Sequence, residues 1–176
     1  MVTNLKSQTR RLKLVETLIL VLMGVLMYIS QVIMAPLPNI ELVSFLTVIV
    51  ARRFGFKSFI SVYTFAFLEV MTYGIAIWNV MYLYVWAILA LLVLPFRKID
   101  NVILYTVISG IFGIAFGVLC SVPYFITGGP GMGIAWIVSG FIEFDIPHCV
   151  GNVVLMAILY IPITKAFNYI LDKTLK

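Results

Sequence analysis

Charged residues are scarce in this sequence. Only 11% of its 176 residues are Asp, Glu, Lys or Arg, while hydrophobic residues make up 63% and the mean hydropathy is +1.14. A soluble domain usually carries about 25% charged residues. This deficit excludes a soluble enzyme and an aqueous binding module, and it predicts an integral membrane protein. The lipid bilayer is therefore an expected partner, and nucleic acid is not.

Residue types that carry catalysis or bind metals are also few. The chain has a single histidine, His148, and two cysteines, Cys120 and Cys149, too few for a disulfide framework. The spacing around His148 matches no standard zinc motif, and neither an H-E-x-x-H nor a Walker sequence is present. We therefore expect no metal site, no cofactor and no catalytic residue, and we do not expect the chain to be an enzyme.

Long apolar runs, separated by charges, prolines and glycines, dominate the sequence. They cover about residues 14–34, 40–54, 58–74, 79–95, 102–126 and 149–170. An α-helix needs about 20 apolar residues to cross the hydrocarbon core, and most of these runs approach that length. The sequence therefore predicts an all-α integral membrane protein with a single domain over residues 1–176. We expect a compact bundle of six transmembrane helices, the first run being retained rather than cleaved as a signal peptide.

The twelve Lys and Arg residues alternate with the apolar runs in a regular way. Four precede the first run, three separate the second from the third, two separate the fourth from the fifth, and three lie at the C-terminal end. With six spans, all twelve fall on one side of the membrane. The positive-inside rule then predicts cytoplasmic N and C termini, with residues 1–13 as a cytoplasmic segment.

The connections on the opposite side contain no Lys or Arg. Two are short, at residues 35–41 and 74–79, and the third is a long outer loop over residues 127–148. Long loops in compact domains are usually functional, and the Gly-Gly-Pro-Gly start at 128–131 would give this one the freedom of a lid. Residues 132–142 are too few to cross the membrane, so we expect a loop or interfacial helix there.

Acidic residues on this outer side are candidates for binding a ligand. Glu69 lies in the third run, about five residues from its outer end and so roughly 7 Å deep. An ionisable group at that depth indicates function by default, although pairing with a tyrosine or a backbone amide is an alternative. Asp145, two residues before Pro147, has the alternative role of capping the sixth helix.

Two stripes of side chains recur at helical spacing. Trp78, Tyr82 and Trp86 share one face of the fourth run, where they would form either an interfacial belt or a stacking surface for a flat ligand. The second stripe consists of Ser109, Gly113, Gly117 and Ser121. Small residues on one face allow close helix contact, so this stripe predicts packing within the bundle.

Four stretches together resemble a known family of membrane proteins. They are PNIELVSFLTVIVARRFGFK (38–57), YGIAIWNVMYLYVWAIL (73–89), SGIFGIAFGVL (109–119) and SGFIEFDIPHCVGNVVLMAILYIPI (139–163). In combination they are similar to the substrate-binding S components of energy-coupling factor (ECF) transporters, which are bacterial vitamin importers, and the likeness extends over about residues 35–165.

The resemblance implies a multi-pass protein of the bacterial plasma membrane that binds a vitamin-like molecule at its outer face. It implies as partners a transmembrane coupling protein and two cytoplasmic ATPase subunits. Many S components carry Ala-x-x-x-Ala on the first helix as a contact for the coupling protein, whereas this chain has TLILVLMGVLMY (17–28), in which only Gly24 is small. The docking surface is therefore expected to differ.

By this resemblance and by residue type, a defined set of side chains is expected to bind the substrate. The set is Asn39, Glu41, Glu69, Tyr73, Trp78, Asn79, Tyr82, Trp86, Trp136, Glu143, Asp145, His148 and Asn152. Cobalamin is the first candidate cargo, with riboflavin-like, pterin and pantothenate-type compounds as alternatives. Free metal ions are disfavoured because the Met-His N-terminus of the family's nickel and cobalt members is absent. The alternative function is a stand-alone proton-coupled carrier or channel that uses Glu69 and His148.

Overall fold

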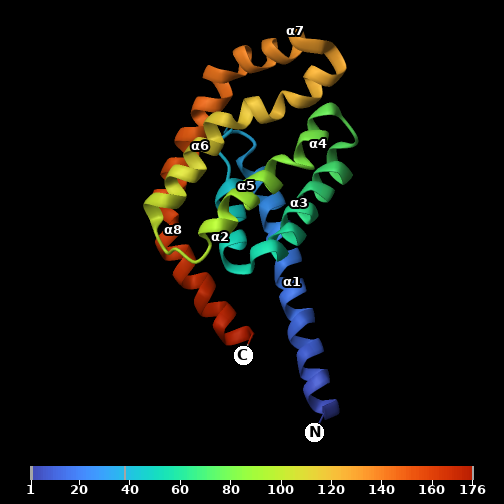
Figure 1. Cartoon of the computed structure of the whole chain (residues 1–176), viewed down its shortest axis with the longest axis vertical. Coiled ribbons are helices and arrows are strands. Elements are labelled where there is room, and N and C mark those ends of the chain that lie inside the picture. The colour runs from blue at the N-terminus through green and yellow to red at the C-terminus, as the bar shows by residue number, and fades with distance from the viewer. Residues whose placement is uncertain (1, 38, 176) are drawn as a thin grey trace.

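The protein is helical in all the regular elements that the structure describes. This computed structural model describes residues 2–37 and 39–175, with side chains from residue 12 onward. The longer helices are α1 (Val2–Met34), α2 (Val43–Phe54), α3 (Ser58–Tyr73), α4 (Ile77–Tyr82), α5 (Val85–Val93), α6 (Val102–Cys120), α7 (Val122–Gly140) and α8 (Ile146–Thr174). Short helical turns are η1 (Gly55–Lys57), η2 (Leu94–Phe96) and η3 (Phe141–Asp145). Both chain ends lie at one end of the molecule, here termed the terminal end, and α7 lies at the opposite, hairpin end (Figure 1).

Among the residues that the structure describes, five helical stretches are long and apolar enough to cross a membrane. They are Leu12–Met34, Val43–Tyr73, Ile77–Phe96, Val102–Cys120 and Val122–Thr174. The protein is therefore a multi-pass membrane protein of the all-α class. The second stretch contains both α2 and α3, which are joined by a turn at Gly55 (Figure 1), where φ is 63°. A positive φ of this kind is readily adopted only by glycine.

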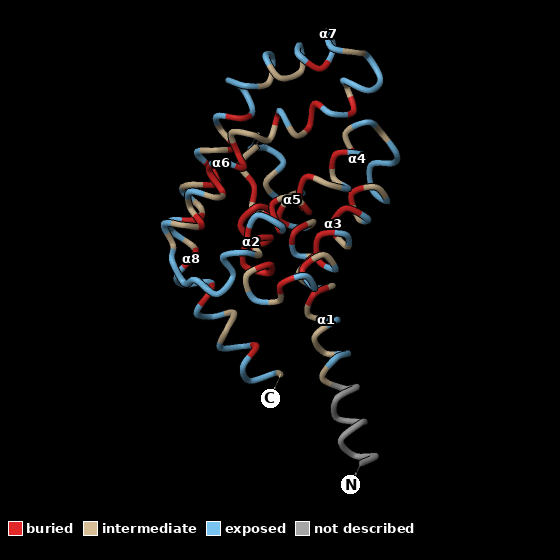
Figure 2. Tube along the Cα trace, in the orientation of Figure 1, coloured by how far each residue is buried: buried red, intermediate tan, exposed pale blue. Residues whose placement is uncertain are grey.

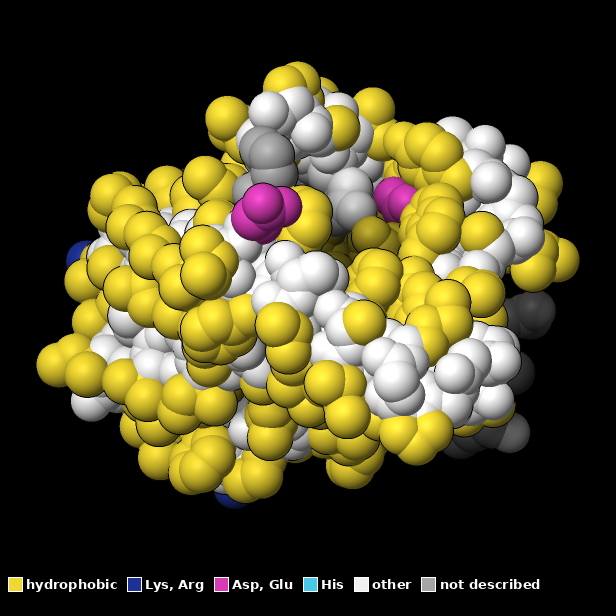
Figure 3. All heavy atoms as spheres, turned by 90° about the horizontal axis from the view of Figure 1, so that it is seen from above, with side chains coloured by type: hydrophobic (Ala, Val, Ile, Leu, Met, Phe, Trp, Pro, Cys, Tyr) yellow, Lys and Arg dark blue, Asp and Glu magenta, His cyan; other side chains and the backbone are white. Residues whose placement is uncertain are grey.

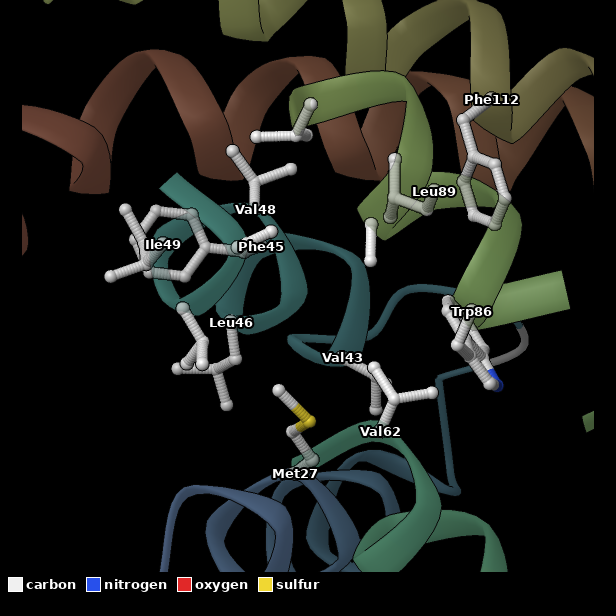
Figure 4. Close-up of a cluster of buried hydrophobic side chains, with 14 of the residues drawn as sticks. Met27, Val43, Phe45, Leu46, Val48, Ile49, Val62, Trp86, Leu89 and Phe112 are labelled. Atoms are coloured by element: carbon white, nitrogen blue, oxygen red, sulfur yellow. The ribbon is translucent and has the colours of Figure 1, made fainter. Parts of the chain in front are cut away.

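Helix α2 forms the centre of the bundle. All its residues from Val43 to Ala51 are buried, and it contacts α1, α3, α5, α6 and α8. Met27 of α1, Val62 of α3 and Leu89 of α5 pack around it (Figure 4). A helix that is apolar on every side belongs in the interior. Buried residues accordingly concentrate around α2 and α5, whereas α7 is largely exposed (Figure 2).

Helices α6 and α8 pack along the glycines of α6. A Cβ atom added to Gly113 would lie 2.7 Å from the backbone nitrogen of Cys149, and one added to Gly110 would lie 2.9 Å from a methyl group of Val153. The two backbones thus approach too closely for larger side chains. The predicted packing role of this small-residue stripe is confirmed at Gly113 and Gly117, which both face α8 or the turn that precedes it.

Residues 127–148, which we predicted to be a long outer loop with a loop or interfacial helix at 132–142, are helical except at Gly129. Helix α7 bends back at Gly129, where φ is 73° and ψ is −174°, and Pro130 follows the bend. The two arms of α7 form a helical hairpin (Figure 1), and the stacked rings of Tyr124 and Trp136, with centroids 4.1 Å apart, join the arms. Helix is favoured over loop because backbone polar groups in apolar surroundings must find partners within the chain.

The expectation that Asp145 caps α8 is wrong. The wide turn η3 joins α7 to α8 without interruption, so no free helix start is present at this point. The carboxylate of Asp145 instead faces α6, where its Oδ1 accepts a hydrogen bond of 2.9 Å from the backbone N–H of Gly117. Asp145 therefore links the hairpin to α6.

The close approach of α6 and α8 leads to a stability prediction. Gly113→Ala should lower the free energy of unfolding by about 1–3 kcal/mol, because the added methyl group overpacks the contact with Cys149. Gly131→Ala is the matched control, since no atom lies within 4 Å of its added Cβ and alanine favours helix. Thermal unfolding in detergent measures both variants. Equal melting temperatures for Gly113→Ala and the wild type would contradict the packing.

Candidate binding cavity

A cavity of about 460 Å³ lies at the hairpin end of the bundle. Figure 3, which views this end, shows a hollow with an acidic side chain at its rim, and Lys and Arg only at the margins of the view. Its lining comes from α1, from the connection between α1 and α2, and from each helix from α3 to α8. The described lining residues are Gln31, Met34, Ala35, Leu37, Asn39, Ile40, Glu41, Glu69, Tyr73, Trp78, Met81, Tyr82, Trp86, Phe116, Cys120, Trp136 and His148. The volume is that of a small-molecule site, for which roughly 300–1,000 Å³ is usual.

An aromatic wall forms one side of the cavity. Trp78, Tyr82 and Trp86 follow one another edge to face, with centroid distances of 5.7 Å and 6.1 Å. The helix is interrupted between α4 and α5, where the hydroxyl of Tyr84 donates to the carbonyl of Leu119 at 2.7 Å, yet the three rings stay in line. Trp86 is only 1% exposed, so this stripe extends into the bundle rather than forming a lipid-facing belt.

A polar network forms the floor of the cavity. His148 Nε2 lies 3.1 Å from Glu41 Oε1 and 3.3 Å from the hydroxyl of Ser44. Asn152, one turn further along α8, donates to Ser44 Oγ at 3.3 Å and to the carbonyl of Ser109 at 3.1 Å. The network thus connects the start of α2 with α6 and α8, and its side chains are buried.

Glu41 occupies its position because of the helix that follows it. Its two carboxylate oxygens accept the backbone N–H of Ser44 at 3.1 Å and 3.0 Å, at the N-terminus of α2. The first N–H groups of a helix have no partner within the helix, and the helix dipole favours a negative charge there. The connection before α2 reaches this point through Asn39, whose φ is 54°. Asn39 also lines the cavity.

Four buried polar atoms of the lining residues have no hydrogen-bond partner among the described residues. They are Gln31 Oε1, Glu69 Oε1, Trp86 Nε1 and His148 Nδ1. Buried polar groups are nearly always paired in native proteins, so each unpaired one requires an explanation. The other end of the Gln31 amide is paired, since its Nε2 donates to Tyr82 at 2.9 Å. All four belong to side chains that line the cavity, so a bound ligand is a candidate partner for them.

The structure brings most of the predicted binding residues to this cavity. Those that line it are Asn39, Glu41, Glu69, Tyr73, Trp78, Tyr82, Trp86, Trp136 and His148. Trp136 comes from the second arm of α7, so the hairpin lies over the cavity at the place where we expected a lid.

The remaining predicted residues do not line the cavity. Asn79 is buried, and its Oδ1 accepts the backbone N–H of Ala76 at the start of α4. Glu143 is exposed on η3, and Asp145 faces α6. Asn152 lies below His148 as part of the floor network. The positions of these four residues depend on how the helices pack, which their residue type alone did not reveal.

Several lining residues were missed by the sequence analysis. They are Gln31, Met34, Ala35, Leu37, Ile40, Met81, Phe116 and Cys120. Gln31 had a usable signal, because it is the one amide side chain in the first apolar run. The apolar residues among them carried no signal, since in a membrane protein the same residue types also face lipid.

The two acidic residues of η3 provide a test of this assignment. Asp145→Ala should lower the free energy of unfolding by about 1–3 kcal/mol, because it removes the partner of Gly117 and leaves a void against α6. Glu143→Ala removes the same charge from an exposed position and should leave stability unchanged. Thermal unfolding in detergent measures both, and equal effects would mean that Asp145 does not link the hairpin to α6.

Comparisons with known proteins give no further guide to this site. No protein-family model, no curated protein and no solved structure matches the chain. The cavity, its aromatic wall and its floor network are therefore the features from which a function has to be inferred.

Proposed function

We propose that this protein is the substrate-binding S component of an ECF-type importer and captures an organic micronutrient at the outer face of the membrane. The observation that carries the proposal is the cavity of about 460 Å³, whose lining includes buried polar atoms without partners. A structural void in a bundle is normally apolar, because an unpaired buried polar group is costly. A polar void therefore calls for an occupant, and beside the aromatic wall an organic ligand fits better than water alone.

The chemistry of the cavity restricts the class of ligand. Its described lining contains two carboxyl groups, from Glu41 and Glu69, and no Lys or Arg. A ligand with a carboxylate, such as a pantothenate-type compound, would find no cationic partner there. The aromatic wall favours a flat ring. We propose a neutral or cationic heteroaromatic compound that donates hydrogen bonds to Glu69.

The cavity volume ranks the remaining cargo candidates. Cobalamin, with its corrin ring and attached nucleotide, is much larger than a riboflavin-like or pterin ring system. A volume of about 460 Å³ favours the smaller compounds. Cobalamin would require the α7 hairpin to move away from the aromatic wall.

We further propose the assembly and orientation of the S-component family. In this arrangement six helices span the bacterial plasma membrane, because α2 and α3 cross separately, and both termini are cytoplasmic. The basic residues at the terminal end then satisfy the positive-inside rule. ATP hydrolysis takes place on two partner ATPases, and a coupling protein connects them to this chain.

A stand-alone proton-coupled carrier is the alternative function. Glu69 and His148 both line the cavity, as that function would require. A carrier also needs a route to the other side of the membrane. Below the floor network, however, the centre of the bundle is filled by apolar side chains such as Met27, Val48 and Leu89 (Figure 4). This packing favours a binding subunit.

The proposal predicts that a ligand remains bound during purification. The protein, purified from cells grown in rich medium, should release a stoichiometric micronutrient that mass spectrometry can identify. Proteoliposomes containing only this chain should not take up protons. An empty protein that transported protons without partner chains would support the carrier instead.

Two conservative substitutions test the assigned contacts. Glu69→Gln and Trp86→Phe should each weaken binding of the co-purified compound about tenfold, because the first removes the negative charge and the second removes the indole N–H and part of the aromatic wall. Glu16→Gln, at the terminal end of α1, is the control and should bind normally. Quenching of tryptophan fluorescence measures the affinities. Unchanged affinity in both cavity variants would exclude this cavity as the site.

A further inference from the structure

A second cavity lies at the terminal end of the bundle, on the opposite side of the core from the first. Its volume is about 220 Å³. It is bounded by the C-terminal end of α2, the turn after η2 and the second half of α8. Its lining residues are Ile49, Arg52, Arg53, Arg97, Lys98, Thr164, Phe167 and Asn168.

The cavity carries an excess of positive charge. Two of its four basic residues are paired, because Arg52 contacts Asp100 at 2.9 Å and Arg53 contacts Asp172 at 2.9 Å. Arg97 and Lys98 form no ion pair with any described residue. Four cations and two carboxylates leave a net charge of 4 − 2 = +2. This excess of positive charge favours a bound anion.

Two buried donors in this cavity also lack partners. They are Arg52 Nε and Thr164 Oγ1 among the described residues. The guanidinium of Arg52 is held in place by the rings of Tyr105 and Tyr160, whose centroids lie 5.8 Å and 5.5 Å away. Thr164 is only 7% exposed. Arg53, Arg97 and Lys98 are exposed, so their charge alone requires no ligand. The buried and unpaired hydroxyl of Thr164 beside them is the feature that solvation does not explain.

Exposed apolar side chains lie next to the cavity. Phe96 and Ile99 flank Arg97 and Lys98 in sequence, and Ile163 precedes Thr164 on α8. All three are exposed in the isolated chain. In a membrane these three side chains can contact lipid acyl chains. An anion bound in the cavity would therefore lie between basic side chains and an apolar surface.

We propose that this cavity binds the phosphate group of an anionic phospholipid. Arg97 and Lys98 supply the uncompensated charge, and Arg52 Nε and Thr164 Oγ1 supply fixed donors to the phosphate oxygens. Basic pockets between helices at the cytoplasmic side of membrane proteins recognise such head groups. This site is separate from the first cavity and does not depend on what that cavity binds.

Lipid retention by the full-length protein tests the proposal. The protein is reconstituted in equal parts of phosphatidylcholine and phosphatidylglycerol, extracted in detergent and analysed by native mass spectrometry. The double variant Arg97→Gln/Lys98→Gln should retain about tenfold less phosphatidylglycerol, since two charge-assisted contacts are lost. Thr164→Val keeps the side-chain shape and should retain about threefold less. The double variant Lys165→Gln/Lys173→Gln removes the same charge from exposed positions of α8 and should retain lipid like the wild type.

Each outcome of this experiment supports or overturns the proposal. An equal loss of phosphatidylglycerol in the Lys165→Gln/Lys173→Gln control would show that retention depends on general surface charge, and it would overturn the proposal. Equal retention in all variants would also overturn it, and would favour an acidic side chain of a partner protein as the occupant. Inorganic phosphate is then added to the wild type. Displacement of the lipid by millimolar phosphate would assign the site to soluble phosphate, whereas retention would support the lipid.

Discussion

The start of helix α2 is the constraint on which the rest of the structure depends. This short helix lies inside the bundle, where its first backbone N–H groups cannot reach water. The carboxylate of Glu41 pairs with Ser44 N–H, and His148 pairs with Glu41 in turn. Burial of α2 therefore joins an ionisable side chain from the first third of the sequence to one from the last third.

The same network explains why a polar cavity exists above an apolar core. The groups that satisfy α2 face the hairpin end, and α1, α3 and α7 complete the walls around them. The apolar side chains of α2 face all the other helices, so they close the floor. The same side chains thus support the buried helix α2 and shape the cavity. A substitution at His148 would therefore affect both the stability of the bundle and the cavity.

Much of the fold followed from the sequence, and the site followed in part. Apolar runs predicted most of the helices, because bilayer thickness sets the length of each apolar segment separately. The break between α4 and α5 and the division of the 102–126 run between α6 and α7 did not follow from them. Aromatic and ionisable residues such as Trp86, Glu69 and His148 were recognisable because they are costly in apolar surroundings. An interfacial helix was one of the two expectations for residues 132–142. The hairpin itself was not predicted, because the glycines at 128–131 suggested a loop, whereas the apolar environment favours helical hydrogen bonding on both sides of the bend. The contacts of Asp145 and Asn152 were missed because they depend on packing between distant segments.

The size of the first cavity has a thermodynamic consequence. Water that fills a cavity of about 460 Å³ would meet an aromatic wall on one side and the polar floor on the other. The water against the aromatic wall is poorly coordinated, and its return to bulk would contribute to the affinity for any ligand that displaces it. Association would then have a negative heat-capacity change, because ring surfaces leave water on both the ligand and the wall. Affinity would consequently vary with temperature in a curved manner, and its enthalpic share would grow as the membrane warms.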